Sequence, residues 1–153
     1  MKQKNIIVVT GGAGFIGSNL ALKLISKGYN VTVLDNLSEQ IHGRDPEINS
    51  SLYLSIRDKV TFIKGDVTDK EDWRKAINNQ QIIIHFAAET GTGQSMYQMH
   101  KYVDVNINGT AIFLDLLANE PHSVKKVIVA SSRSIYGEGK YKSKEKGRVY
   151  PGH

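Results

Sequence analysis

The chain has 153 residues, a formal net charge of +5, 40% hydrophobic residues and 23% charged residues, which is typical of one soluble globular domain. Fourteen glycines and three prolines exclude a collagen or a proline-rich linker. The lack of cysteine excludes disulfides, thiolate metal sites and a cysteine nucleophile. Since no apolar run approaches the ~18 residues of a membrane span, we expect a cytoplasmic protein with no membrane partner.

The positive charge is concentrated in the last residues. Residues 140–153 carry a net charge of +4, so the other 139 residues together carry only +1. A basic segment can bind nucleic acid or anionic lipid, but no aromatic stacking pattern accompanies this one. We therefore interpret residues 140–153 as a solvated basic tail and predict no nucleic-acid partner.

Short apolar runs alternate with amphipathic segments, an order typical of βαβ units in a parallel sheet. The predicted strands are residues 5–10, 31–34, 60–64, 81–86 and 124–130. Four helices are predicted. The first begins at Phe15 and stops at Gly28, the second lies around residues 49–57, the third begins with the capping-box pattern Thr68–Glu71, and the fourth occupies residues 95–119. No complete element is predicted after Gly137. The predicted fold class is α/β: a Rossmann-type doubly wound parallel sheet of about five strands in three αβα layers, over residues 1–139.

The strongest functional signal is the glycine-rich segment Thr-Gly-Gly-Ala-Gly-Phe-Ile-Gly-Ser at residues 10–18. It lies between a predicted strand and a predicted helix, where such a segment binds the pyrophosphate of a dinucleotide. Gly11 would permit the tight turn, Gly14 the approach of backbone to pyrophosphate, and Gly17 close packing of helix on strand. No lysine follows Gly17, which excludes an ATPase or GTPase phosphate loop. A glycine-rich turn without a ligand is the alternative.

Asp35 ends the second predicted strand, 18 residues after Gly17. A carboxylate in this place can accept hydrogen bonds from both ribose hydroxyls and would repel a 2′-phosphate. The next two residues, Asn36 and Leu37, include no arginine for that phosphate. The segment therefore favours NAD over NADP, the alternative being a carboxylate that only caps a helix or a turn.

Five blocks of sequence together resemble one family. They are residues 10–17, Asp-Asn-Leu at 35–37, Gly-Asp-Val-Thr-Asp at 65–69, His-Phe-Ala-Ala-Glu at 85–89, and Ser-Ser-Arg-Ser-Ile-Tyr-Gly at 131–137. The combination resembles the extended short-chain dehydrogenase/reductase family, the NAD-dependent nucleotide-sugar epimerases and dehydratases. This resemblance covers residues 5 to about 140.

The resemblance implies a set of site residues. Those expected to contact NAD are Gly11, Gly14, Phe15, Ile16, Gly17, Asp35, Asn36, Asp66, Val67, Phe86, Ala87, Ala88 and Asn106. Ser132 matches the serine or threonine that hydrogen-bonds the reacting sugar hydroxyl, although it could instead cap the end of a strand. Ser95 resembles a substrate-side position.

Histidines and the predicted helix at residues 95–119 have other expected roles. His85 ends an apolar strand, so we interpret it as a core histidine and not as a base. The other histidines show no metal-ligand spacing, and no metal site is predicted.

The helix predicted at residues 95–119 resembles the one that forms the dimer interface in the family, and the fifth strand would leave an exposed edge. We therefore expect a homodimer or other self-association.

The family's chemistry requires a Tyr-x-x-x-Lys pair on a helix, in which the tyrosine accepts a proton and the lysine lowers the tyrosine pKa. Two segments match this spacing, Tyr97–Lys101 upstream of Ser132 and Tyr136–Lys140 just after it. We interpret both as coincidental, because the first is misplaced and the second contains two glycines. The chain is thus expected to be the amino-terminal, NAD-binding half of such an enzyme, with a truncated sheet and no turnover of its own.

Two further segments indicate the reaction. Dehydratases of the family carry an Asp-Glu pair where this chain has Arg133 and Ser134. Without this acidic pair, the block at residues 131–137 resembles that of C4 epimerases, which oxidise a hydroxyl to a ketone and return the hydride to the other face. Residues 89–96 further resemble epimerases of surface-polysaccharide sugars, linked to UDP or dTDP. Half of a related dehydratase or reductase, and a non-enzymatic NAD-binding or interaction module, are the alternatives.

Overall fold

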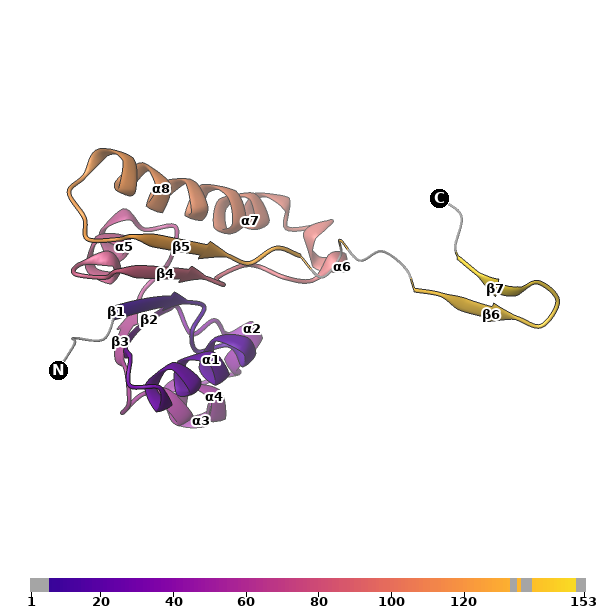
Figure 1. Cartoon of the computed structure of the whole chain (residues 1–153), viewed down its shortest axis with the longest axis horizontal. Helices are drawn as coiled ribbons and strands as arrows, with labels where there is room; N and C mark the ends of the chain where they lie inside the picture. The colour runs from indigo at the N-terminus through magenta and orange to yellow at the C-terminus, as the bar shows by residue number, and fades with distance from the viewer. Residues whose placement is uncertain (1–5, 133–134, 136–138, 151–153) are drawn as a thin grey trace.

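The computed structural model describes residues 6–132, 135 and 139–150. Five parallel strands form one sheet in the order β3-β2-β1-β4-β5 (Figure 1). They are β1 (Ile6–Thr10), β2 (Asn30–Asp35), β3 (Thr61–Lys64), β4 (Ile82–His85) and β5 (Lys126–Val129). The chain first adds strands on one side of β1 and then on the other, which confirms the predicted Rossmann-type α/β fold.

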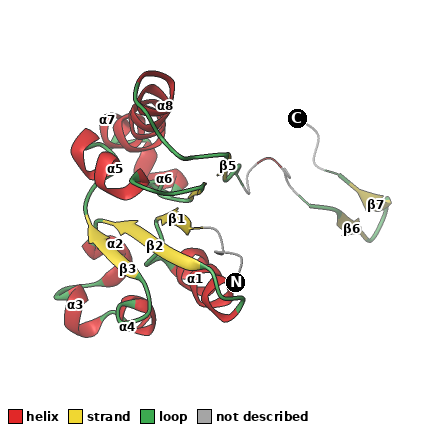
Figure 2. Cartoon of the chain, turned by 60° about the vertical axis from the view of Figure 1, so that its left-hand side comes forward, coloured by secondary structure: helices red, strands yellow, loops and turns green. Residues whose placement is uncertain are grey.

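Helices cover both faces of the sheet (Figures 1 and 2). On one face lie α1 (Phe15–Ser26) and α4 (Ser51–Ile56), and on the other lie α5 (Lys70–Ile77) and α8 (Gly109–Asn119). Successive residues of a strand point to opposite faces, so β1 contributes to two cores. Val9 joins the core beneath α1, and Val8 joins the core that contains Trp73 and Phe113. The three predicted layers are therefore present.

Three short helices connect β2 to β3 where one was predicted. They are α2 (Glu39–His42), α3 (Pro46–Asn49) and α4. Ser50 is the N-cap of α4, and its Oγ accepts a hydrogen bond from the Tyr53 N–H at 3.3 Å. The prediction around residues 49–57 is confirmed by α4, while α2 and α3 are single turns that are too short to show a helical periodicity.

The N-cap of α5 is Asp69 and not the predicted Thr68. The Asp69 carboxylate accepts hydrogen bonds from the Glu71 N–H at 2.7 Å and the Asp72 N–H at 2.9 Å. The Thr68 hydroxyl instead donates to Asp66 Oδ1 at 2.8 Å. The predicted N-cap is one residue too early, because the Thr68 hydroxyl donates a hydrogen bond to Asp66 and does not cap the helix.

The predicted helix over residues 95–119 is interrupted. It consists of α6 (Thr92–Ser95), α7 (Met99–Val103), the π-helical segment η1 (Asp104–Asn108) and α8. Ser95 ends α6 and does not begin a long helix. Gly109 begins α8 close to the loop after β3, since a Cβ there would lie 3.0 Å from Val67 Cγ2.

A β-hairpin follows the sheet, so the prediction that no element is complete after Gly137 is wrong. It joins β6 (Tyr141–Ser143) to β7 (Gly147–Val149) in an antiparallel pair that lies apart from the sheet in Figure 1. The Ser143 hydroxyl accepts hydrogen bonds from two N–H groups of the turn, and Gly147 has φ +69°. The predicted basic tail therefore contains a β-hairpin over residues 141–149.

Candidate functional site

A cavity of about 900 Å³ opens at the carboxyl ends of the parallel strands. Its walls are the loops that follow β1, β2, β3, β4 and β5, on both sides of the point where the strand order reverses. Ligands of doubly wound sheets bind at this edge. The structure brings every predicted site residue to this cavity: Gly11, Gly14, Phe15, Ile16, Gly17, Asp35, Asn36, Asp66, Val67, Phe86, Ala87, Ala88, Ser95, Asn106 and Ser132.

The three spaced glycines of the turn have different surroundings. Gly11 has φ +64°, and a Cβ there would lie 2.8 Å from the Ala87 nitrogen. A Cβ on Gly17 would lie 2.3 Å from the carbonyl oxygen of Gly11, the residue that follows β1, so α1 approaches this turn too closely for a side chain at position 17. A Cβ on Gly14 would meet only that same oxygen, at 3.4 Å, so the fold itself does not require glycine at position 14.

The amino end of α1 faces the cavity without a side-chain cap. Gly14 is the N-cap and makes no side-chain hydrogen bond, and the first turn contains no acidic residue. The N–H groups of a first helical turn have no partner within the helix and attract anions. Phe15 and Ile16 line the cavity while 74% and 66% exposed. Together these features can hold a pyrophosphate and cover part of a dinucleotide.

Asp35 joins the end of β2 to the glycine turn. Its carboxylate accepts hydrogen bonds from the Ala13 N–H through Oδ2 and the Leu37 N–H through Oδ1, both at 2.9 Å. The side chain is 8% exposed. Because each carboxylate oxygen can accept more than one hydrogen bond, Asp35 can cap this turn and still accept hydrogen bonds from ribose hydroxyls.

Asp66 connects the loops after β2 and β3. It accepts hydrogen bonds from the Thr68 N–H and hydroxyl and, at 2.9 Å, from Asn36 Nδ2. Burial raises the pKa of Asp66, but the hydrogen bonds from Thr68 and Asn36 and the charge of Lys101 outweigh burial, and the pKa is lowered. The carboxylate is therefore charged at neutral pH, on the wall where the adenine is expected.

His85 is a buried, doubly hydrogen-bonded residue. Thr10 Oγ1 accepts the N–H groups of Phe86 and Ala87 at 3.2 Å, so its own proton goes to His85 Nδ1 at 2.7 Å. Nε2 then donates to Thr110 Oγ1 at 3.2 Å. Burial lowers the pKa of His85 to about 4. The interpretation as a neutral core histidine is confirmed.

Asn106 holds the loop after β4 in place. Its Oδ1 accepts from the Glu89 N–H at 2.8 Å, and its Nδ2 donates to the Glu89 carbonyl at 3.1 Å. The Glu89 carboxylate pairs with Lys101 Nζ at 2.8 Å. Asn106 therefore positions the cavity wall through backbone, while Ser95 donates its hydroxyl proton to the Thr92 carbonyl at 2.7 Å on the same side.

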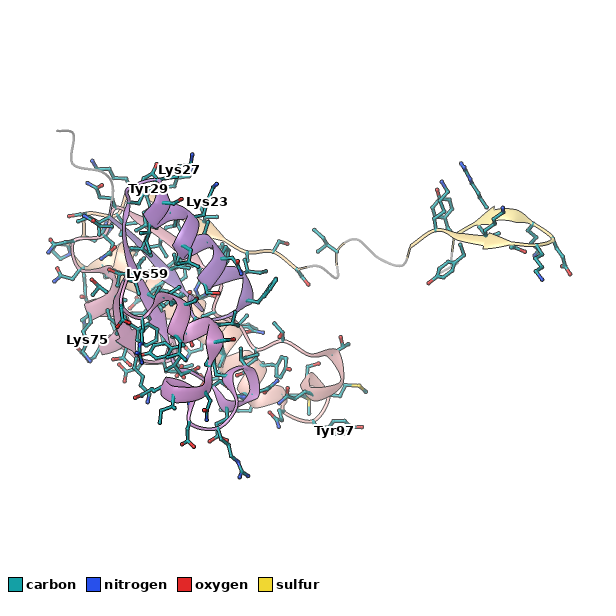
Figure 3. All side chains as sticks on the ribbon, turned by 90° about the horizontal axis from the view of Figure 1, so that it is seen from below. Lys23, Lys27, Tyr29, Lys59, Lys75 and Tyr97 are labelled. Atoms are coloured by element: carbon teal, nitrogen blue, oxygen red, sulfur yellow. The ribbon has the colours of Figure 1, made fainter. Side chains whose placement is uncertain are left out.

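Tyr97 does not belong to the site. It is 85% exposed, does not line the cavity, and projects from the end of the segment between α6 and α7 (Figure 3). Ser132 lies on the cavity wall, and its carbonyl accepts the Ile135 N–H at 3.4 Å. Arg133, Ser134 and Tyr136 lie outside the described residues, as does any geometry of the Tyr136–Lys140 spacing.

Sequence reasoning missed three polar residues of the cavity region. Thr10 is fully buried at the end of an apolar strand, where a hydroxyl needs a partner and is itself a signal. Gln40 forms a reciprocal amide pair with Gln94, at 2.6 and 3.0 Å, between the loops after β2 and β4. His42, which has no metal-ligand spacing in the sequence, is buried beside Asp35.

The described residues lack what a metal site and a membrane-spanning helix require. Within the described residues, no three histidine, aspartate or glutamate side chains gather in a way that could hold a metal ion. Every helix in the described part of the chain is too short or too polar to cross a membrane.

The sequence matches a known protein family. A model of the NAD dependent epimerase/dehydratase family matches residues 7–152. The dTDP-L-rhamnose 4-epimerase of Burkholderia thailandensis is 38% identical over 148 residues, which are 95% of this chain and 39% of that protein. The UDP-glucose 4-epimerase of Bacillus subtilis is 38% identical over 133 residues, 86% of this chain and 38% of that protein.

Solved structures of such enzymes have the same fold. The UDP-glucose 4-epimerase of Bifidobacterium longum, in complex with NAD+ and UDP, superposes with a TM-score of 0.67 at 34% identity over 86% of this chain and 38% of that one. A dTDP-glucose 4,6-dehydratase of Streptomyces venezuelae superposes with a TM-score of 0.72 at 26% identity over 88% and 42%. The chain spans about two fifths of the length of these relatives.

Proposed function

Because the chain belongs to the NAD dependent epimerase/dehydratase family, we propose that residues 1–153 form the NAD-binding half of a nucleotide-sugar 4-epimerase. One observation carries this proposal. The uncapped amino end of α1, the open side of Gly14 and the Asp35 carboxylate border one cavity where the strand order reverses. That arrangement fits a pyrophosphate followed by an adenosine ribose.

In this proposal each wall of the cavity binds a different part of NAD. The N–H groups at the start of α1 hold the pyrophosphate, and Asp35 accepts hydrogen bonds from the ribose hydroxyls. Asp66 and Val67 lie beside the adenine, and residues 86–88 line the phosphate and nicotinamide-ribose side. NAD, when bound, supplies the hydride acceptor that turns a sugar C4 hydroxyl into a ketone and the donor that returns the hydride to the other face.

Two serines border the sugar side of the proposed site. Ser132 hydrogen-bonds the reacting hydroxyl, and Ser95 belongs to the wall on the substrate side. We assign the proton-accepting tyrosine to no described residue: Tyr102 lines the cavity but has no lysine four residues later, and Tyr97, which has one, projects away from the cavity. The 153-residue chain should therefore bind NAD and leave UDP- or dTDP-sugars unconverted.

Calorimetric titration of the purified chain with NAD and NADP tests the cofactor assignment. We expect NAD to bind and NADP to bind more weakly, because the Asp35 carboxylate repels a 2′-phosphate. Asp35→Asn should weaken NAD binding about tenfold and narrow the difference between the two cofactors. Asp45→Asn, an exposed change in the next loop, is the matched control. A wild-type chain that binds no NAD would overturn the proposal.

The epimerase assignment rests on the relatives. The dTDP-L-rhamnose 4-epimerase of Burkholderia thailandensis and the UDP-glucose 4-epimerase of Bacillus subtilis are each 38% identical to this chain. The resemblance of residues 89–96 supports a place in the synthesis of surface-polysaccharide sugars, and the absence of cysteine suits a reducing cytoplasm. Incubating the chain with NAD and UDP-glucose, and following NADH absorbance and epimer ratio, tests the half-enzyme assignment. Measurable conversion would contradict it.

We also propose that the chain forms a homodimer through α6, α7, η1 and α8. Met96, Met99, Val103, Ile107 and Leu114 follow one another at helical spacing and are each at least half exposed. Light scattering should give twice the 17.0 kDa of the chain. Val103→Glu should give the monomer, whereas Lys59→Glu, on the other side of the sheet, should not. A monomeric wild type at high concentration would contradict this interface.

A further inference from the structure

His42, the last residue of α2, is buried on the cavity wall beside Asp35. The side chains of His42 and Asp35 are 2% and 8% exposed. His42 Nε2 lies 3.7 Å from Asp35 Oδ1, and Nδ1 lies 2.8 Å from Ser50 Oγ. The imidazole therefore lies between the carboxylate of Asp35 and the N-cap of α4.

The two ring nitrogens of His42 face different groups. Ser50 Oγ accepts the Tyr53 N–H at 3.3 Å and lies 2.8 Å from His42 Nδ1, to which it can donate or from which it can accept. Nε2 is the ring nitrogen that faces Asp35. A separation of 3.7 Å exceeds a hydrogen bond and lies within ion-pair range. A neutral ring consequently interacts weakly with Asp35, and a charged ring interacts strongly.

Asp35 is the charged partner that His42 meets at short range in the described part of the chain. The other charged groups on the surrounding segments are solvent-exposed, and solvent and salt screen them. They are Glu39 on α2, Arg44 and Asp45 in the next loop, Glu47 on α3, which pairs with Lys64 at 2.5 Å, and Arg57 after α4, which pairs with Asp58 at 3.3 Å.

We propose that His42 is a positioning residue for ribose recognition: neutral, it leaves the Asp35 carboxylate to the adenosine ribose, and charged, it draws that carboxylate to itself. This rests on the proposed function, since it takes Asp35 as the ribose ligand. The imidazolium and the ribose hydroxyls compete for the same oxygens, so proton binding and NAD binding oppose one another. Histidine is the side chain that ordinarily changes charge between pH 5 and 8. The affinity for NAD should therefore fall as the pH falls.

The test is the Kd for NAD of the 153-residue chain between about pH 8 and pH 5.5, measured by calorimetry. In the wild type we expect Kd to rise about five- to tenfold toward acid. His42→Gln keeps an amide donor near the place of Nε2 but cannot be charged, and its Kd should change less than about twofold. His100→Gln, on the exposed surface of α7, is the matched control and should follow the wild type. His85 stays neutral over this range, since burial lowers its pKa to about 4.

The outcomes separate the inference from the proposed function. NAD binding at pH 8 with a flat wild-type profile, or with the same profile in His42→Gln, would overturn the role of His42 alone. Absence of NAD binding at pH 8 would overturn both. Should His42→Gln lose its cooperative unfolding transition, His42→Asn and Asp35→Asn replace it, and each should remove the pH dependence.

Discussion

Replacing Gly17 by alanine should move α1 away from the glycine turn. The added Cβ would lie 2.3 Å from the Gly11 carbonyl oxygen and 2.5 Å from the Gly12 Cα. Both neighbours are backbone atoms of a tight turn, so no side chain can rotate to make room. The amino end of α1, where the pyrophosphate is proposed to bind, has to shift.

The size of the effect follows from two opposing contributions. Reaching 3.0 Å, the least separation that a Cβ tolerates, requires a displacement of about 0.7 Å at the closer contact. Overpacking of this kind costs about 1–3 kcal/mol, and rigid backbone neighbours place it near the upper value. The helix preference of alanine returns about 1 kcal/mol. We expect a net loss of about 2 kcal/mol in unfolding free energy, or about 4–8 °C in Tm for a chain of this size.

Gly14→Ala is the matched control within the same turn. Its Cβ would meet the Gly11 carbonyl oxygen at 3.4 Å, an ordinary contact, so the cost is that of alanine as a poorer N-cap, about 1 kcal/mol or less. The same Cβ fills the side proposed for the pyrophosphate, so the affinity for NAD should fall at least about tenfold. Urea denaturation and calorimetric NAD titration measure both quantities on both variants.

The two variants can refute different parts of the reasoning. A Gly17→Ala chain as stable as the wild type would show that α1 is not tightly packed on the turn. A Gly14→Ala chain with unchanged NAD affinity would show that the pyrophosphate does not approach that residue. An equal loss of stability in both variants would contradict the distinction between packing and binding glycines.

Three other changes test the described contacts. Asp69→Ala should lower the unfolding free energy by about 1 kcal/mol in urea denaturation, because it removes the N-cap of α5, and an unchanged midpoint would contradict this. Asn106→Asp should cost about 1–2 kcal/mol and speed amide exchange at Glu89, whose carbonyl loses its donor. The pKa of His85 is lowered to about 4, so stability should be full above pH 6.5 and decrease by about 2–3 kcal/mol as the pH falls toward 4. The unfolding free energy of His85→Gln should depend less on pH between about pH 6.5 and 5. Equal pH dependence in the wild type and the variant would show that His85 is not its cause.

The sheet could be predicted because each strand is a short apolar run, and the three central strands β1, β2 and β4 are largely buried. All five predicted strands overlap those of the structure. The hairpin of β6 and β7 could not be predicted in this way. Its strands have three residues each, and Lys142 is opposite Arg148, so no apolar alternation is present to detect. Backbone pairing and the turn at Gly147 form it instead.

The site was predictable where its residues are consecutive in the sequence. The glycine turn and Asp35 follow strand ends, and a strand end is visible in the sequence. The contacts of His42 with Asp35 and of Asn106 with Glu89 connect different segments, and both depend on the conformation of the loops. A polar residue in a loop has many possible partners, so spacing alone does not select His42 over the other histidines.

Hydrogen bonds within this chain connect the loops around the cavity. Ala13 donates to Asp35, Asn36 donates to Asp66, and Asn106 bridges to Glu89, so the loops after β1, β2, β3 and β4 are fixed by groups within this chain. A preorganised site loses less conformational entropy when it binds a ligand. Since these contacts involve only residues 13–106, we expect NAD binding to require no segment outside the chain. For this reason the binding experiments on the 153-residue chain can refute the proposed site.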